Sequence, residues 1–307
     1  ISKTLWLNQE YPETRKAKHF LSAPEWVAYC LGAELVNELS LVSRTGFYDV
    51  EARAPWREAM ALVGGGEDFL ARLVVAGEPI GVVNNNAPEV LRGAVITIAG
   101  HDHFTAAYYC GAINEGSLFD SMGTAEALLR TFKKPLSRDA IAELAAANVG
   151  LSASVIADHF TLLGALPTGL TLERVCSLVG VSTRDEKIAL GEAALKIDPK
   201  ASALRVNNDY HGLSVTNLDD AVSPAALFRA TAEHLVEESA NMVSLIEKFT
   251  GQATDVVIAG GWVKNPMIAS AKTKQFGSYK VSDATEAGAT GAAEFAGIAA
   301  GILKLRS

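Results

Sequence analysis

The sequence predicts an α/β protein in which a sheet is covered by helices on both faces. Short apolar runs alternate with segments of helical spacing through the second part of the chain. Two of these runs end in small residues: Ser117 to Met122 leads into Gly123-Thr124, and Asp255 to Ala259 leads into Gly260-Gly261. Strands that alternate with helices pack as layers around a central sheet, so this pattern predicts the layered α/β class.

Composition limits the kinds of partner that fit this chain. Its 307 residues are 49% hydrophobic and 20% charged, as in globular proteins of about two domains. A net charge of −8 argues against nucleic acid and against anionic membranes as partners. The three cysteines are far apart, which predicts neither a disulfide framework nor a metal site and favours a reducing cytoplasm. We expect a cytoplasmic protein, and a homodimer only because two-fold assemblies are common.

Residues 1–100 are expected to hold short elements around polar loops. The chain opens at Ile1, within a pattern typical of a helix end, so we expect it to be part of something longer. The loop Glu38 to Tyr48 is expected to cover a cleft wall, and Gly77 to Val83 is expected to be a turn and a strand. The predicted helices are Ser2 to Leu7, Lys18 to Leu31, Trp56 to Val63 and Pro88 to Arg92.

The segment that joins the two parts carries a lone carboxylate. The apolar run Ala94 to Ala99 predicts a buried strand, and Phe104 to Cys110 predicts a helix of small residues. Asp102 lies between them, and ligands of open α/β folds sit beyond the carboxyl ends of strands. The carboxylate is therefore either a general base or a plain helix cap. The flanking histidines, His101 and His103, favour hydrogen bonding to a substrate over metal binding, and His103 is the better placed.

The rest of the chain is expected to alternate between strands and helices. The longest predicted helix, Pro224 to Phe249, has Ser223 as its cap and stops at Gly251. The other predicted helices are Ser137 to Ala146, Leu170 to Leu178, Thr183 to Leu195, Lys264 to Lys274 and Glu286 to Leu303. The other predicted strands are Leu151 to Leu163 and Lys280-Val281.

Three glycine turns follow predicted strands and are candidate ligand sites. They are Gly123-Thr124, Gly164 to Gly169, and Gly260-Gly261 with Asn265 four residues on. Glycine lets the backbone approach a phosphate or a flat ring closely, and a helix start attracts an anion. Each turn alone is equally well interpreted as an ordinary strand-to-helix turn. The Walker sequence and the G-x-G-x-x-G fingerprint are absent from the sequence.

Four segments together resemble the FGGY carbohydrate kinases, which have the actin-like ATPase (ribonuclease H-like) fold. They are GHDHFTAAYYCGA, SMGTAEALL, AGGWVKNPMIAS and EAGATGAAEFAGIAAGI. The resemblance implies a mixed sheet flanked by helices, and transfer of the ATP γ-phosphoryl group to a sugar or polyol, with Mg²⁺ accompanying the nucleotide. It implies that residues 1–100 belong to the amino-terminal, sugar-binding domain and residues 101–307 to the carboxyl-terminal, nucleotide-binding domain.

The same resemblance assigns roles to individual residues. Asp102 falls on the catalytic base and His103 on a position that faces the substrate. The implied nucleotide-binding residues are the phosphate turn Gly123 and Thr124, the contact Gly169, and the adenosine turn Gly260, Gly261 and Asn265. It implies no protein residue as a metal ligand. His103, the Ser43 to Asp49 loop and Trp6 are the candidates for sugar specificity.

The chain departs from the family pattern at its start and in one loop. The early Asp-x-Gly-Thr phosphate loop is missing, so we expect the carboxyl-terminal two thirds only, with an incomplete first domain. We therefore expect this polypeptide to be inactive alone or to need a companion piece. The segment Leu204 to Leu218 is shorter than its family counterpart, which suggests that a loop is absent. Two alternatives stay open: a catalytically silent relative that binds nucleotide or sugar, and another actin-like ATPase such as a chaperone or filament protein. Asp102 favours an active kinase over both.

Overall fold

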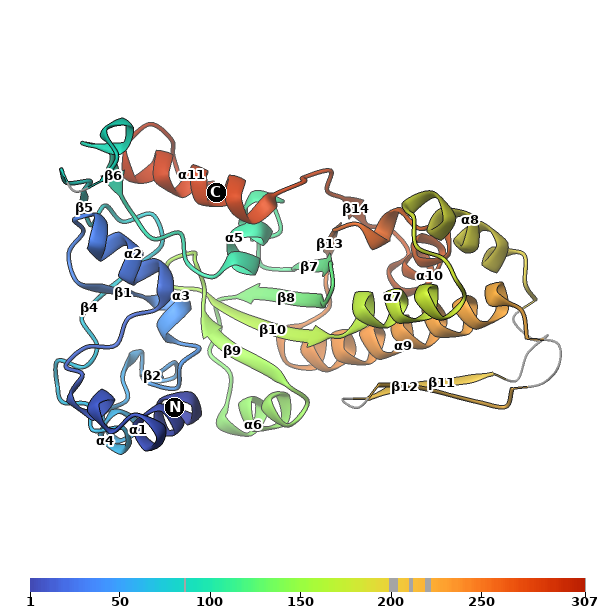
Figure 1. Cartoon of the computed structure of the whole chain (residues 1–307), viewed down its shortest axis with the longest axis horizontal. Helices are drawn as coiled ribbons and strands as arrows, with labels where there is room; N and C mark the ends of the chain where they lie inside the picture. The colour runs from blue at the N-terminus through green and yellow to red at the C-terminus, as the bar shows by residue number, and fades with distance from the viewer. Residues whose placement is uncertain (86, 199–203, 210–211, 219–221, 307) are drawn as a thin grey trace.

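A computed structural model of the chain describes residues 1–85, 87–198, 204–209, 212–218 and 222–306. The molecule is elongated: residues 1–100 form one end, α7 and α8 lie toward the other, and a sheet lies between them (Figure 1). The helices are α1 Ser2–Glu10, η1 Pro12–Lys16, α2 Ala23–Leu31, α3 Leu39–Val42, α4 Arg57–Leu62, η2 Glu89–Leu91, α5 Asp102–Tyr109, α6 Arg138–Ala146, α7 Thr168–Leu178, α8 Arg184–Leu195, α9 Pro224–Thr250, η3 Trp262–Lys264, α10 Pro266–Phe276 and α11 Ala287–Ala299. The strands are β1 Val36–Glu38, β2 Tyr48–Asp49, β3 Ala54–Pro55, β4 Arg72–Val74, β5 Gly81–Val82, β6 Val95–Ile96, β7 Ser117–Met122, β8 Glu126–Phe132, β9 Val149–Ala153, β10 Phe160–Leu166, β11 Arg205–Asp209, β12 Gly212–Thr216, β13 Asp255–Ala259 and β14 Lys280–Val281.

The largest sheet among the described residues has six strands in the order β14-β13-β7-β8-β10-β9. β13 runs parallel to both β14 and β7, whereas the β7–β8, β8–β10 and β10–β9 pairs are antiparallel. The predicted mixed sheet is therefore confirmed. Since β7 and β13 are parallel neighbours, their carboxyl ends lie at the same edge of the sheet, which brings the residues that follow them together.

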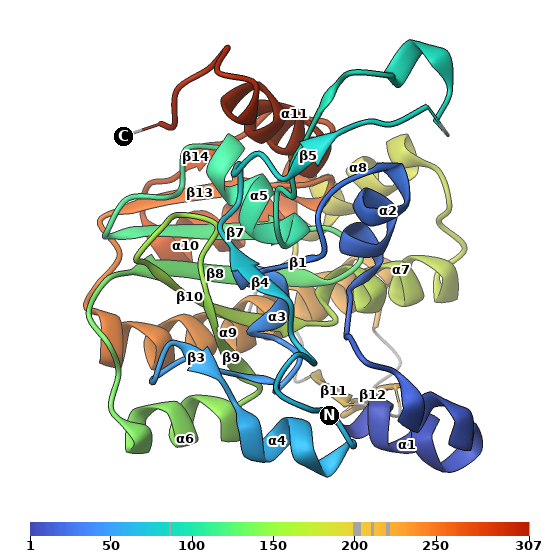
Figure 2. The same ribbon diagram turned by 90° about the vertical axis from the view of Figure 1, so that its left-hand side faces the viewer.

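Both faces of this sheet are buried. The side chains of Val257, Phe119, Leu129 and Leu163 follow one another across four strands and pack under α5 and α11. The next residue along β13, Ile258, belongs instead to the core beneath α9 and α10, because successive side chains of a strand point to opposite faces. Figure 2 shows α5 and α11 on one side of the sheet and α9 on the other.

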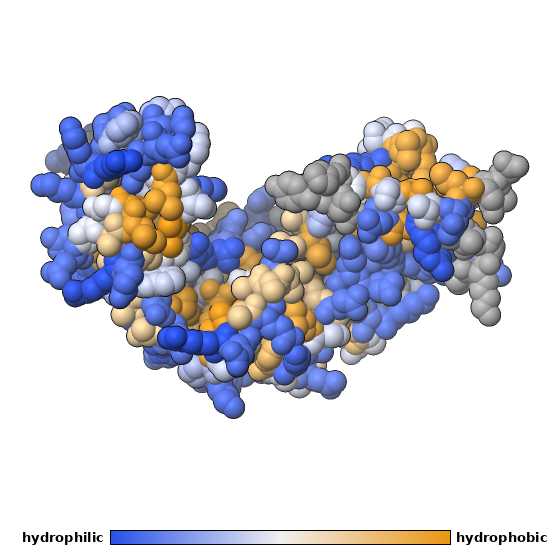
Figure 3. All heavy atoms as spheres, turned by 90° about the horizontal axis from the view of Figure 1, so that it is seen from below, coloured by the Kyte–Doolittle hydropathy of each residue, from blue (hydrophilic) through white to orange (hydrophobic). Residues whose placement is uncertain are grey.

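Residues 1–100 form two smaller cores around short strand pairs. Within the described part of this region the pairs are β1–β4, β2–β3 and β5–β6, each of two strands. One core gathers around Phe47 and Met60, and the other around Val36 and Ile80. A broad hollow separates this end of the molecule from the end that carries α7 and α8 (Figure 3).

Several predicted elements differ from the structure. Ala94 to Ala99 is not a buried strand of the main sheet: only β6 forms, and it pairs with the two-residue β5, so Asp102 follows a stretch of coil. The predicted strand Leu151 to Leu163 is two strands, because the chain turns back between β9 and β10. Gly164 lies inside β10 rather than in a turn, where a side chain would collide with Met242 of α9. The loop Glu38 to Tyr48 contains α3.

Other predicted elements are confirmed where a capping residue or a glycine marks their ends. β7 and β13 have the predicted limits, and α9 begins after Ser223, whose side chain accepts a hydrogen bond from the Ala226 N–H. α6 and α8 likewise begin after the capping residues Ser137 and Thr183. The segment 204–218 forms the β11–β12 hairpin, whose residues 210–211 lie outside the described part. None of the described helices has the length and apolar character needed to cross a bilayer.

Candidate active site

The predicted glycine turns meet at the edge where β7 and β13 end. Gly123 and Thr124 form the exposed turn between β7 and β8. Gly169 packs so closely against the carbonyl oxygen of Gly123 that no side chain fits between them, and the Leu170 N–H donates to the Thr124 carbonyl at 2.8 Å. Gly260, in the left-handed region at φ +106°, also lies so close to the backbone of Met122 that a side chain would collide with it. The structure thus brings Gly123, Thr124, Gly169 and Gly260 together.

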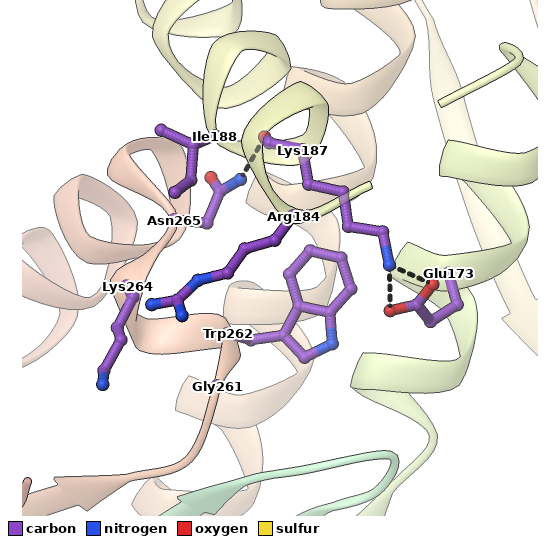
Figure 4. A pocket seen from close by; sticks show the side chains of 8 residues that line it. All are labelled: Glu173, Arg184, Lys187, Ile188, Gly261, Trp262, Lys264 and Asn265. Carbon is purple, nitrogen blue, oxygen red and sulfur yellow. Dashed lines mark hydrogen bonds and ion pairs between the residues drawn. The ribbon is translucent and has the colours of Figure 1, made fainter. Parts of the chain in front are cut away.

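Gly261 and Asn265 lie beside this turn, on the wall of a cavity of about 360 Å³. Its lining residues come from α7, α8 and the η3–α10 segment: Glu173, Arg184, Lys187, Ile188, Gly261, Trp262, Lys264 and Asn265. Figure 4 shows the indole of Trp262 within the group, with Arg184 beside it and Lys187 extended toward Glu173. The Lys187 ammonium lies 2.7 Å from both Glu173 oxygens and 5.7 Å from the centre of the Trp262 ring. The volume and the aromatic wall suit a small planar ligand.

The Asn265 side chain is committed to the fold. Its Oδ1 accepts from the Met267 N–H at 3.0 Å and caps α10, while its amide donates to the Lys187 carbonyl at 2.8 Å. It is 4% exposed, so it shapes the cavity by holding α8 against α10. Gly261, in contrast, is exposed, and a Cβ added to it would have no neighbour within 4 Å. The space above Gly261 is therefore open to a ligand.

Asp102 and His103 form a second group, at the start of α5. Asp102 is the first residue of this helix and follows the capping position, which His101 occupies. Its side chain is 80% exposed, and one oxygen accepts from the His103 N–H at 2.8 Å. The contacts that join the glycine turns do not include either residue. The exposed carboxylate is open to a ligand; it lies one residue past the N-cap position and accepts one backbone N–H of the first helical turn.

The ring of His101 is neutral near pH 7. Burial, and then the Arg44 guanidinium, lower the pKa of His101 to about 4, although the Asp102 carboxylate opposes this shift. Its Nδ1 lies 3.1 Å from Asp102 Oδ1, and its ring stacks on that of His103 with centres 5.9 Å apart. A neutral imidazole brings no positive charge to the side of Asp102, and the Arg44 guanidinium is the cation that interacts with this carboxylate.

A buried carboxyl group fixes the backbone that precedes Asp102. The Ser40 hydroxyl donates to Glu38 Oε2 at 2.6 Å and accepts from the His101 N–H at 2.9 Å. Gly100, at φ +89°, lies against the same hydroxyl, where a side chain would collide. Burial raises the pKa of Glu38 to about 7. Because α3 belongs to residues 1–100, this contact sets the position of Asp102 relative to that end of the molecule.

A second buried polar cluster lies directly behind the β7–β8 turn. The Lys272 ammonium is 2.7 Å from Asp120 Oδ2 and 2.6 Å from Glu126 Oε1, and all three side chains are inaccessible to solvent. Glu126 also accepts from the hydroxyls of Ser239 and Thr168, each at 2.6 Å. Burial and the neighbouring Glu126 raise the pKa of Asp120 to about 7. The two carboxylates outweigh burial and raise the pKa of Lys272, so its charge is retained.

The sequence patterns predict no functional role for several residues of the site and of the two buried clusters. Trp262 directly follows Gly260-Gly261, so its place in the turn was a usable signal. Glu126 lies two residues after Thr124, so its position in the sequence also indicates that it is near the turn. Lys272, Thr168 and Glu38 meet their partners only through the tertiary fold, and spacing alone does not reveal them. Within the described residues, no group of three or more His, Cys, Asp or Glu side chains is placed to hold a metal ion.

Known proteins resemble this chain in both sequence and structure. The model of the N-terminal domain of the FGGY family of carbohydrate kinases matches residues 1–108. An L-fuculokinase of Escherichia coli (strain K12) is 24% identical over 308 residues, covering 96% of this chain and 63% of the relative. An autoinducer-2 kinase of the same strain is 25% identical over 337 residues, covering 98% of this chain and 61% of the relative. The chain thus spans about three fifths of the length of these relatives.

Solved structures decide the fold. A xylulose kinase from Rhodospirillum rubrum superposes with a TM-score of 0.82 at 16% identity, covering 97% of this chain and 62% of that one. A Plasmodium falciparum glycerol kinase with ADP superposes with a TM-score of 0.84 at 16% identity. The superposition covers 98% of this chain and 63% of that one. The fold is that of the actin-like ATPases. This confirms the predicted fold. Since the N-terminal domain model lies on residues 1–108, the expectation that only the carboxyl-terminal two thirds of such a kinase is present is not supported.

Proposed function

We propose that this chain phosphorylates a sugar or polyol with ATP. The observation that carries the proposal is the meeting of Gly123-Thr124, Gly169 and Gly260 beside an aromatic-walled cavity, in a protein with an open carboxylate at the start of α5. The similarity to an L-fuculokinase and an autoinducer-2 kinase supports this reaction class. Residues 101–307 would hold the nucleotide, and residues 1–100 would contribute to the sugar side.

In this proposal the ATP lies along the edge formed by β7 and β13. The adenine occupies the cavity against Trp262, with Gly261 allowing close approach, and the phosphates lie over the exposed turn at Gly123 and Thr124. Glycines suit this arrangement because backbone N–H groups reach a phosphate only where no side chain intervenes. Asn265 supports the cavity through α8 and α10 rather than by direct contact.

Asp102 would act as the general base. It accepts the proton of the attacking hydroxyl while that oxygen bonds to the γ-phosphorus and the bond to ADP breaks. His103 would hold the substrate beside it, and neutral His101 would add no positive charge next to the carboxylate. The described residues form no three-ligand metal cluster, so Mg²⁺ would arrive on the ATP phosphates, where it neutralises charge.

The test is ADP formation by the purified chain against a panel of ketoses, polyols and autoinducer-2. We expect ADP release that depends on one class of acceptor, accompanied by an ATP-dependent rise of the melting temperature. A silent relative would show the thermal shift without ADP release. ADP release that is independent of every acceptor would favour another actin-like ATPase over a sugar kinase.

A further inference from the structure

The cluster behind the β7–β8 turn connects the pieces that are proposed to hold ATP. Its members come from five elements: Asp120 from β7, Glu126 from β8, Thr168 from α7, Ser239 from α9 and Lys272 from α10. Each has 1% or less of its surface exposed. The turn itself is exposed on the other side. The cluster is therefore out of reach of any ligand and can act on one only through the turn.

Glu126 is the centre of the cluster. Its Oε1 receives the Lys272 ammonium and the Ser239 hydroxyl, and its Oε2 receives the Thr168 hydroxyl, all at 2.6 Å. A hydrogen bond between an ammonium and a carboxyl oxygen is charge-assisted and is stronger than a neutral one. Three donors from three helices therefore fix this carboxylate, and with it the first residue of β8, two residues from Thr124.

The bond from Thr168 matters most for the turn. Thr168 is the first residue of α7, Gly169 packs on Gly123, and the Leu170 N–H reaches the Thr124 carbonyl at 2.8 Å. The first turn of α7 is thus attached to the β7–β8 turn twice, once by the Thr168 side chain through Glu126 and once by backbone. Removing the hydroxyl leaves only the backbone attachment.

We propose that Thr168 and Glu126 are positioning residues for the ATP phosphates. They hold the Gly123-Thr124 turn and the start of α7 in register, so that the turn presents its backbone to the phosphates without rearranging. This inference rests on the proposed function for its ligand, although the positioning itself is a property of the free protein. It predicts that the cluster affects the phosphate end of the nucleotide and leaves the adenosine cavity, lined by Trp262, unaffected.

The test uses Thr168→Val, which keeps the shape of the side chain and removes the donor. Thr168→Ser keeps the hydroxyl. Thr231→Val is the matched control, because Thr231 is also fully buried but, among the described residues, its hydroxyl donates to the Leu227 carbonyl of its own helix alone. Binding of ATP and of adenosine is measured by calorimetry for each variant, and amide hydrogen exchange is measured without ligand.

Thr168→Val is expected to raise the Kd for ATP by about tenfold, or about 1.4 kcal/mol, and to leave the Kd for adenosine unchanged. Exchange of the Gly123 and Leu170 amides should rise in the same variant. Thr168→Ser should restore both, and Thr231→Val should change neither. Equal weakening of ATP and adenosine, or no change in either, would overturn the inference.

The exchange measurement separates this inference from the proposed function. If the wild type binds no ATP and Thr168→Val still releases the Gly123 and Leu170 amides, the positioning role stands and the kinase proposal fails. If ATP binds and those amides exchange as in the wild type, the kinase proposal stands and the positioning role is overturned.

Discussion

At the scale of single residues, glycines shape the candidate site, because they leave space that a side chain would fill. Gly169 and Gly260 are required by the fold, because a side chain at either would collide with the backbone of Gly123 or Met122. Gly261 is not required by the fold, because a Cβ there meets nothing. Because packing does not require glycine at this position, a substitution there tests whether ligand binding requires it.

Gly261→Ala is expected to weaken ATP binding without affecting stability. The added methyl group projects into the open space next to Trp262, so the Kd for ATP should rise by about tenfold. The melting temperature should stay at the wild-type value, since the residue has an ordinary helical conformation at φ −73°. Calorimetry and a thermal melt check both.

Gly66→Ala is the control, because a Cβ added to Gly66 would also have no neighbour within 4 Å and Gly66 lies far from the cavity in sequence. It should leave both quantities unchanged. ATP affinity that is the same in Gly261→Ala and the wild type would show that the nucleotide does not approach this turn.

Much of the site could be read from residues close together in the sequence. The signals at Asp102, Gly123-Thr124 and Gly260-Gly261 each lie within a few residues, and the structure gathers the glycine turns as expected. Asn265 is predicted to bind the nucleotide; its contacts with Lys187 and Gly191 of α8 have no local signal, because these residues are distant in sequence. The Glu126–Lys272 pair spans 146 residues and has no local signal.

At the scale of elements, α5 is held by a helix of small residues. Gly291 of α11 lies against Thr105, and a Cβ there would approach the Thr105 carbonyl oxygen to 2.5 Å. Gly288, one turn earlier, lies near the Asp102 carbonyl but leaves 3.5 Å for a Cβ. The close packing of these two helices therefore fixes α5, and Asp102 with it, against the sheet.

Gly291→Ala is expected to destabilise the protein by about 1–3 kcal/mol, since the two helices must move apart to accept the methyl group. Gly288→Ala on the same helix is the control: it should be neutral or stabilising by up to about 1 kcal/mol, because alanine favours helix. Urea unfolding of both variants measures the difference. Equal free energies of unfolding would mean that α11 does not pack on α5 as described.

Elements were predictable where a capping signal or a glycine marked their ends. α9 and α8 follow their capping residues Ser223 and Thr183, and β13 stops at Gly260. The β9–β10 hairpin was predicted as one strand because the alternation of apolar residues continues across its turn. The failure at Ala94 to Ala99 has a different cause: its partner β5 is only two residues long, so most of the apolar run has no strand to pair with.

At the scale of the whole molecule, residues 1–100 are joined to the start of α5 by buried polar contacts near Asp102. Glu38 carries this connection, because it binds Ser40, which holds the His101 N–H. Burial raises the pKa of Glu38 from 4.5 to about 7, so its protonated form is favoured in the folded protein. The stability that this group contributes is fully present below pH 4.5 and is lost as the pH rises through about 7.

Glu38→Gln imitates the protonated form and should remove this pH dependence. Between pH 5 and pH 8 the wild type should lose up to about 3 kcal/mol more of its free energy of unfolding than the variant. Urea unfolding at four pH values measures it. Asp120, whose pKa is also raised, is present in both proteins and cancels in the comparison. If the free energy of unfolding changes with pH equally in both proteins, Glu38 is not the source of this pH dependence.

In the proposed mechanism, Asp102 takes the proton of the acceptor hydroxyl while the glycine turns hold ATP. The most direct measurement is acceptor-dependent ADP formation by the wild type and Asp102→Asn, with the Kd for ATP determined on the same samples. We predict a loss of rate of at least about 100-fold in Asp102→Asn, with the Kd for ATP unchanged. An Asp102→Asn variant that forms ADP at the wild-type rate would show that Asp102 is not the general base.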